Sequence, residues 1–237
     1  MQLPQPLIHG KLIKRYKRFL ADVELDSGDV ITAHCANPGG MIGLKEPGID
    51  VWLSQSDNPK RKLKYSWELC QIGDAWVGIN TAHPNAIVEE AILAGKIPQL
   101  AGYESLKREV KYGKNSRIDI LLSDPDRGLC YVEVKNVHLK RDEDVPGLAE
   151  FPDAVTARGA KHLDEMADMV AEGHRSVMFY LIQRTDCDRF TLATDIDPHY
   201  AQRFKAARNS GVEAIAYDCA IDTSAVTVRN PLPITGL

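Results

Sequence analysis

Two apolar segments near the middle of the chain carry charged side chains in a pattern that could hold a metal ion. Asp119 lies within residues 116–122, and Glu133 and Lys135 lie within residues 129–137. The turn-forming residues between the two segments predict a hairpin. Alternate side chains of a strand share one face, so Glu133 and Lys135 point the same way and the hairpin brings Asp119 alongside them. Two carboxylates would bind Mg²⁺ or Mn²⁺, and Lys135 would orient or deprotonate water or offset charge on a phosphate.

A solvated hairpin can carry the same pattern, and its Glu–Lys pair would then contribute only tenths of a kcal/mol. The neighbouring residues favour an active site. Ile118, Ile120 and Val132 are typical of interior strands, where an unpaired charge is costly. The Asp…Glu-x-Lys arrangement resembles the active site of restriction-endonuclease-like phosphodiesterases, the PD-(D/E)xK superfamily.

A helix predicted at residues 85–94 would complete this site. Asn85 is expected to cap the helix and Gly95 to end it. Its apolar residues form one stripe, and Glu90 is expected to lie nearer the centre of that stripe than Glu89 does. Glu90 is therefore predicted to reach inward as a catalytic residue and a further metal ligand. An exposed helix glutamate is the alternative.

A second helix, predicted at residues 154–172, has a polar face and an apolar face. Arg158, Lys161, His162 and Glu165 recur at the spacings i, i+3, i+4 and i+7. In related nucleases a helix in this position supplies basic residues to the site or to the backbone phosphates, and Arg158 and Lys161 fit that role. His162 is expected to pack or to contact phosphate, with a role as general base as one alternative. A wholly solvated polar face is the other.

Residues 10–80 are predicted to form a small β-barrel of the oligonucleotide/oligosaccharide-binding (OB) type. Strand-like segments separated by turn formers occur at 19–25, 30–35, 49–54, 65–72 and 75–79. Two basic runs lie in this part of the chain: Lys11, Lys14, Arg15, Lys17 and Arg18, and then Lys60, Arg61, Lys62 and Lys64. The first run is predicted to bind nucleic acid, with Tyr16, Phe19 and Trp52 as candidate stacking residues. Solvated faces and core packing are the alternatives.

The remainder of the chain indicates an α/β layout with a mixed sheet. Strands are predicted at 106–112, 176–182 and 211–218, a helix at 198–209, and a charged loop at 139–151. The fold class is therefore α+β: a small OB-like barrel followed by an α/β domain. The net charge of −4 gives no global argument for nucleic acid, and the five cysteines lack zinc spacing. No segment is apolar enough to span a membrane and no signal peptide is evident, so a cytoplasmic protein is expected.

Six blocks in matching order extend the resemblance along the whole chain. They cover residues 33–41, 106–110, 116–119, 131–135, 151–156 and 158–163. On these blocks the chain resembles the bacterial and archaeal sugar fermentation stimulation protein A family. The resemblance implies an OB-like barrel at residues 1–82 and a restriction-endonuclease-like domain at residues 83–237. Asn37 and Arg117, which lie in two of the blocks, are expected to contact nucleic acid.

The same resemblance implies a DNA-binding protein, largely without sequence specificity, with a role in regulating sugar (maltose) metabolism. Intact Asp119, Glu133 and Lys135 favour an active Mg²⁺- or Mn²⁺-dependent DNA endonuclease or exonuclease as the alternative. RNA processing is a further alternative, because the barrel does not reveal which sugar it binds. The DNA could be double- or single-stranded, and a homodimer would suit cleavage of a duplex.

Overall fold

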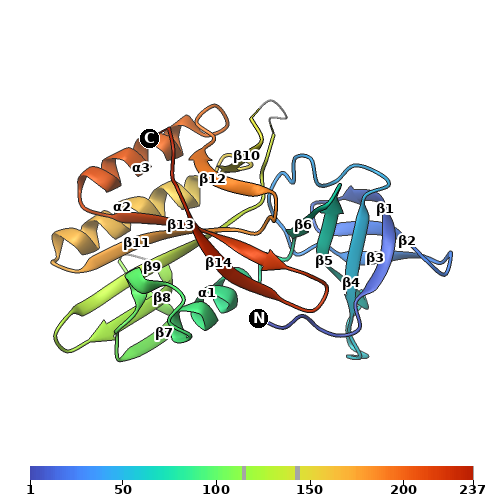
Figure 1. Cartoon of the computed structure of the whole chain (residues 1–237), viewed down its shortest axis with the longest axis horizontal. Coiled ribbons are helices and arrows are strands. Elements are labelled where there is room, and N and C mark those ends of the chain that lie inside the picture. Colours follow the sequence, from blue (N-terminus) through green and yellow to red (C-terminus); the bar gives the residue numbers. More distant parts are fainter. Residues whose placement is uncertain (114–115, 142–144, 237) are drawn as a thin grey trace.

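Residues 8–78 form a five-stranded barrel with one additional strand (Figure 1). The strands are β1 (Ile8–Tyr16), β2 (Leu20–Leu25), β3 (Val30–His34), β4 (Asp50–Gln55), β5 (Tyr65–Ile72) and β6 (Ala75–Gly78). The order is β3-β2-β1-β4-β5, a parallel pairing of β3 with β5 closes the ring, and β6 pairs with β5. This connectivity confirms the predicted OB-type barrel. The computed structural model describes residues 1–113, 116–141 and 145–236.

Alternation of side chains explains why these segments form a closed barrel. In β2, Ala21 and Val23 are fully buried inside the barrel, while Asp22 and Glu24 face outward. Strand β1 was not among the predicted segments. It is rich in basic residues, and Leu12 is the large apolar side chain that it contributes to the barrel core, so it lacks a clear apolar alternation. An irregularity in the β1–β2 pairing lies next to that residue and bends the strand around the barrel.

The second half of the chain is built on a six-stranded mixed sheet in the order β14-β13-β11-β9-β8-β7. Its strands are β7 (Ser105–Tyr112), β8 (Ser116–Asp124), β9 (Gly128–Val137), β11 (Arg175–Ile182), β13 (Glu213–Ile221) and β14 (Val226–Leu232). β8 and β9 pair antiparallel, as the turn formers predicted, and β9, β11 and β13 run parallel. The predicted mixed sheet is confirmed.

Within the described parts of the chain, three α-helices and a short second sheet flank the large sheet (Figure 1). The helices are α1 (Pro84–Leu93), α2 (Ala157–Ala171) and α3 (Pro198–Asn209); a short 3₁₀ turn, η1 (Pro98–Leu100), follows α1. Strands β10 (Gly147–Phe151) and β12 (Cys187–Leu192) form the second sheet. The predicted loop at 139–151 was therefore wrong over β10, while its residues 142–144 lie outside the described residues. No helix among the described residues is long and apolar enough to cross a membrane.

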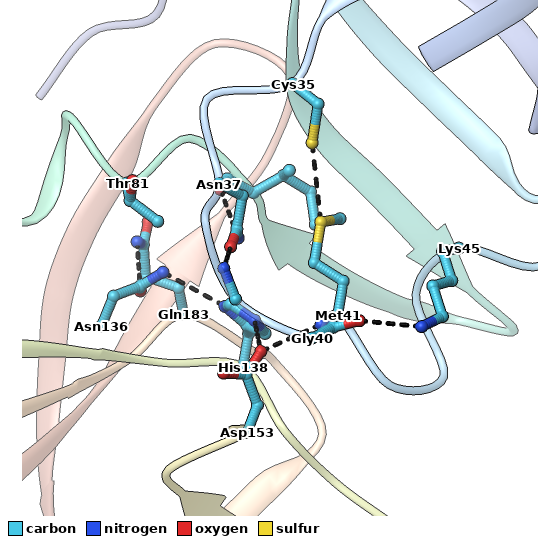
Figure 2. A network of polar contacts seen from close by, with 12 residues as sticks. Cys35, Asn37, Gly40, Met41, Lys45, Thr81, Asn136, His138, Asp153 and Gln183 are labelled. Carbon is cyan, nitrogen blue, oxygen red and sulfur yellow. Dashed lines mark hydrogen bonds and ion pairs between the residues drawn. The ribbon is translucent and has the colours of Figure 1, made fainter. Parts of the chain in front are cut away.

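The barrel and the second half of the chain are joined by shared packing. Leu3 and Leu69 belong to the same buried cluster as residues of the large sheet, and the backbone N–H of Leu3 donates to Ser224 O at 2.8 Å. On another side, Asp153 accepts from the backbone N–H of Met41 at 3.0 Å, as Figure 2 shows. An added Cβ at Gly39 would lie 2.4 Å from an Asp153 carboxylate oxygen, so only glycine allows this close approach.

Candidate active site

The β8–β9 hairpin brings the predicted acidic residues together. Asp119, on β8, accepts from the backbone N–H of Val134 at 2.8 Å and from Asn85 Nδ2 at 2.9 Å. Glu133 and Lys135 share a face of β9, and Lys135 Nζ donates to Glu133 Oε1 at 2.6 Å. The hairpin thus produces one compact group of two carboxylates and one amine, Asp119, Glu133 and Lys135, which we call the acidic group.

The environment acts on the two carboxylates in opposite directions. Burial, together with the neighbouring charge of Glu133, raises the pKa of Asp119 to about 6. Burial also raises the pKa of Glu133, but Lys135 and His162 outweigh it and leave that pKa below its ordinary value. Glu133 Oε2 is buried and has no hydrogen-bond partner among the described residues. An unpartnered carboxylate oxygen beside a second carboxylate fits a bound cation, so these residues suit a divalent metal.

Helix α2 supplies the second side of the site. It begins at Thr156, whose side chain accepts from the backbone N–H of Gly159 at 3.1 Å. One turn later His162, buried, contacts Glu133 Oε1 through its Nδ1. His162 was expected to pack or to contact phosphate. In the structure its ring contacts the carboxylate of Glu133 and so fixes the position of one member of the acidic group. Glu165 is also buried, which the predicted polar face did not anticipate.

A basic cleft adjoins the acidic group. It has a volume of about 350 Å³ and is lined by Ser116, Arg117, Arg158, Lys161 and His162. Arg117 donates to the backbone oxygen of Glu109 at 2.8 Å. Three cationic side chains from β8 and α2 therefore lie in a cleft that shares His162 with the acidic group. A larger cavity of about 990 Å³ lies against α3, β13 and β14, and no residue of the acidic group lines it.

The structure corrects the prediction for Glu90. Its side chain is 61% exposed and forms an ion pair with the amino group of Met1, so it does not reach the acidic group. The inward face of α1 is apolar, and the first turn instead presents Asn85, which donates to Asp119. The sequence had marked Asn85 only as a helix cap. Among the described residues, no three His, Cys, Asp or Glu side chains form a group that could hold a metal.

The prediction that Asn37 contacts nucleic acid was also wrong. Asn37 is 1% exposed; its Nδ2 donates to Ile79 O at 3.0 Å and its Oδ1 accepts from the backbone N–H of Gly39 at 2.9 Å. Arg15 Nη2 donates to the backbone oxygens of Asn37 and Gly39 at 2.8 and 3.1 Å. Both side chains therefore stabilise the loop after β3, part of which Figure 2 shows.

The rest of the first basic run divides into residues that lie close to carboxylates and residues that are exposed in a turn. Lys11 forms an ion pair with Asp50 at 2.5 Å, and Lys14 lies 3.5 Å from a carboxylate oxygen of Asp22. Lys17 and Arg18 lie in the turn between β1 and β2 and are exposed. The turn, rather than the strand, is thus the part of this run that presents charge to solvent.

Comparison with known proteins agrees with this fold. A family model described as "Sugar fermentation stimulation protein RE domain" matches residues 82–225, and one described as "SfsA N-terminal OB domain" matches residues 13–79. The chain belongs to the sugar fermentation stimulation protein family. This confirms the resemblance drawn from the six sequence blocks.

Relatives in the family match over nearly their full length. A sugar fermentation stimulation protein homolog of Rhodospirillum rubrum is 58% identical, covering 99% of both chains, and one of Rhodospirillum centenum is 57% identical, covering 99% of this chain and 100% of the other. A solved structure described as Pyrococcus furiosus SfsA in complex with Ca²⁺ has a TM-score of 0.89 at 23% identity, covering 99% of this chain and 98% of the other. That likeness extends the shared fold across both halves of the chain.

Proposed function

We propose that this protein is a divalent-metal-dependent phosphodiesterase that acts on DNA. The observation that carries the proposal is Glu133 Oε2, buried and without a hydrogen-bond partner among the described residues, beside Asp119 with its raised pKa. A buried and a half-buried carboxylate that repel each other are stabilised by a cation between them. Oxygen ligands favour a hard ion such as Mg²⁺ or Mn²⁺. The P. furiosus relative was solved with Ca²⁺, another ion of that class.

Each residue of the site has a role that follows from its contacts. Asp119 and Glu133 would hold the cation, which supplies charge that activates water and stabilises the phosphate. Asn85 and the Val134 N–H orient Asp119 by donating to its two oxygens. His162 fixes the position of Glu133 from α2. Lys135 lies where it can orient water or offset negative charge on a phosphate.

The basic cleft supports a nucleic-acid substrate. Arg117, Arg158 and Lys161 line it beside the acidic group and could bind backbone phosphates. Phosphate contacts position a substrate but carry no sequence information, so binding through this cleft would be largely independent of sequence. DNA is the proposed substrate class, and RNA is an outcome that the experiment below distinguishes.

DNA binding without cleavage is a second candidate function. It is favoured by the absence of a third carboxylate from the acidic group in the described part of the chain. Affinity for a divalent cation rises with the number of charged ligands, so a site with two carboxylates holds the metal more weakly than one with three. A role in regulating sugar metabolism, which the family name suggests, would require binding alone.

Two assays on four proteins separate these functions. Wild type, Asp119→Ala, Lys135→Ala and the control Glu90→Ala are compared for cleavage of single-stranded, duplex and branched DNA, and of RNA, with Mg²⁺ or Mn²⁺. Binding is measured without metal. Cleavage by wild type and Glu90→Ala, lost in the other two variants while binding remains, supports the phosphodiesterase. Binding by all four without metal-dependent cleavage of any substrate would refute it and leave DNA binding.

A further inference from the structure

The cavity of about 990 Å³ lies where strand β14 stops following β13. β14 pairs with β13 as far as Leu232, which is opposite Ala216. The chain then turns away, and Ile234 forms a bridge with Phe190 of β12 (Figure 1). Among the described residues, 213–215 therefore have a strand neighbour on the β11 side only, and we call them the free edge of β13.

The cavity is lined by β13 residues from both faces of the sheet. Ala214 and Ala216 lie on the face packed against α3. Ile215 and Tyr217 lie on the opposite face, where Tyr217 OH donates to Gln99 Oε1 at 2.7 Å. The cavity thus wraps around the free edge of β13 and has largely apolar walls, so it suits an extended apolar group.

The charged part of the lining is positive. Lys205 and Arg208, about one turn apart on α3, both line the cavity, and no carboxylate among the described residues does. Arg208 Nη1 donates to the backbone oxygen of Val212 at 2.8 Å, which holds its guanidinium at the end of the helix. Glu213, at the start of β13, is instead bound by Arg175 at 2.6 Å. A negatively charged ligand would therefore complement this lining.

We propose that this cavity binds a small carboxylate with an apolar body. The apolar body lies along the free edge of β13, against Phe204 and Ile215, and the carboxylate contacts Lys205 or Arg208. The volume of about 990 Å³ lies within the range of small-ligand sites, roughly 300–1,000 Å³. A fatty acid and an aromatic acid share this chemistry, and the experiment below distinguishes them.

The proposal does not depend on the phosphodiesterase, because no residue of the acidic group lines the cavity. The site has the two features that small-ligand sites share, an apolar wall and a few polar groups that fix the orientation of the ligand. Binding here can therefore be measured without DNA and without metal.

Isothermal titration calorimetry on the whole chain tests the proposal. The ligands are decanoate, octanoate, naphthalene carboxylate and decyltrimethylammonium, which keeps the alkyl chain of decanoate and reverses its charge. The variants are Lys205→Glu and Ala201→Trp, the second of which fills the cavity from α3. Matched controls are Lys107→Glu, exposed on β7 at the opposite edge of the sheet, and Ala206→Trp, exposed on α3 outside the cavity lining.

Decanoate is expected to bind, and decyltrimethylammonium is not. Octanoate should bind about 15-fold more weakly than decanoate, because each buried CH₂ group contributes a factor of roughly four. Lys205→Glu should weaken decanoate binding by about five-fold. Ala201→Trp should abolish it, and both controls should bind as wild type does. Tighter binding of decanoate than of naphthalene carboxylate identifies the apolar body as an alkyl chain, and the reverse order identifies it as an aromatic ring.

The proposal is overturned if neither decanoate nor naphthalene carboxylate binds with a Kd below about 1 mM. Equal affinity for decyltrimethylammonium would overturn it too, as would decanoate affinity unchanged in Lys205→Glu or in a folded Ala201→Trp. If the Tm shows that Ala201→Trp does not fold, Lys205→Glu decides alone, because its side chain is exposed. A second copy of the chain is the competing occupant. Sedimentation velocity that shows a dimer disrupted by Ala201→Trp but not by Ala206→Trp would assign the cavity to that copy and overturn the proposal.

Discussion

Asp119→Asn is expected to make the metal-free protein more stable at neutral pH, and to abolish the proposed cleavage. In the folded protein the pKa of Asp119 is raised from 3.8 to about 6, because burial and Glu133 both oppose its ionised form. A native state that binds the proton more tightly than the unfolded chain loses stability as pH rises from about 4 to 6, and the loss is complete above pH 6. An uncharged side chain removes that penalty.

The magnitude follows from the pKa and the contacts. A rise of roughly two pKa units corresponds to about 3 kcal/mol at pH 7.5. Asparagine keeps one acceptor oxygen for the Val134 N–H but forces Asn85 to rearrange, at a cost of about 1 kcal/mol. The net expectation is a stabilisation of about 2 kcal/mol at pH 7.5. At pH 4, where Asp119 is protonated in the folded protein, the gain should vanish.

Scanning calorimetry of wild type and Asp119→Asn in EDTA at pH 4, 6 and 7.5 measures the effect. For a chain of this size about 2 kcal/mol corresponds to a rise in Tm of roughly 4–8 °C. Glu90→Gln serves as the control, because its carboxylate is 61% exposed. A lower Tm for Asp119→Asn at pH 7.5, or a difference independent of pH, would refute the argument that Asp119 and Glu133 are mutually destabilising without metal.

Three further changes test the contacts that hold the site and the halves together. His162→Ala removes a partner of the buried Glu133 carboxylate and should lower the free energy of unfolding by about 1–3 kcal/mol. His162→Gln should recover part of that loss, and urea unfolding measures both variants. Thr156→Ala removes the α2 cap and should cost about 1 kcal/mol in the same assay, and a smaller change than 0.3 kcal/mol would contradict the cap. Gly39→Ala forces a Cβ against Asp153 and should cost about 1–3 kcal/mol; the double variant with Asp153→Ala should recover most of the loss if the clash is its cause.

Patterns with short periods gave the secondary-structure predictions that the structure confirmed. The alternation around Ala21 and Val23 predicted a strand, and the turn formers between the acidic segments predicted the β8–β9 hairpin. The predicted helix at 198–209 is α3. In each case the signal lies within one element and its immediate turn, where local sterics and burial decide the conformation.

Contacts between distant elements could not be predicted in the same way. His162 and Glu133 are 29 residues apart; the resemblance to related nucleases brought the helix to the site, but no local pattern in either segment indicates that these two side chains contact each other. Glu90 was predicted to lie near the apolar stripe of α1, but at 100° per residue Glu89 and Glu90 are equally far, about 130°, from the centre of that stripe. Helix periodicity therefore could not select Glu90, and its side chain is exposed. Asn37 lies in a loop, which suggests a surface contact, but the loop is buried against Ile79. Strand β12 carries charged residues between its apolar ones and gave too weak a pattern.

The packing of Leu3 has a consequence for the order in which the protein is made. Domains usually fold as they leave the ribosome, the first one before the next is complete. Here Leu3 belongs to a cluster that also contains Leu69, Val226 and Val228, and its backbone N–H is bonded to Ser224. That cluster cannot close until residues 224–228 have been synthesised. Until then the nascent barrel keeps an apolar edge exposed, and strand β14 completes the packing around Leu3.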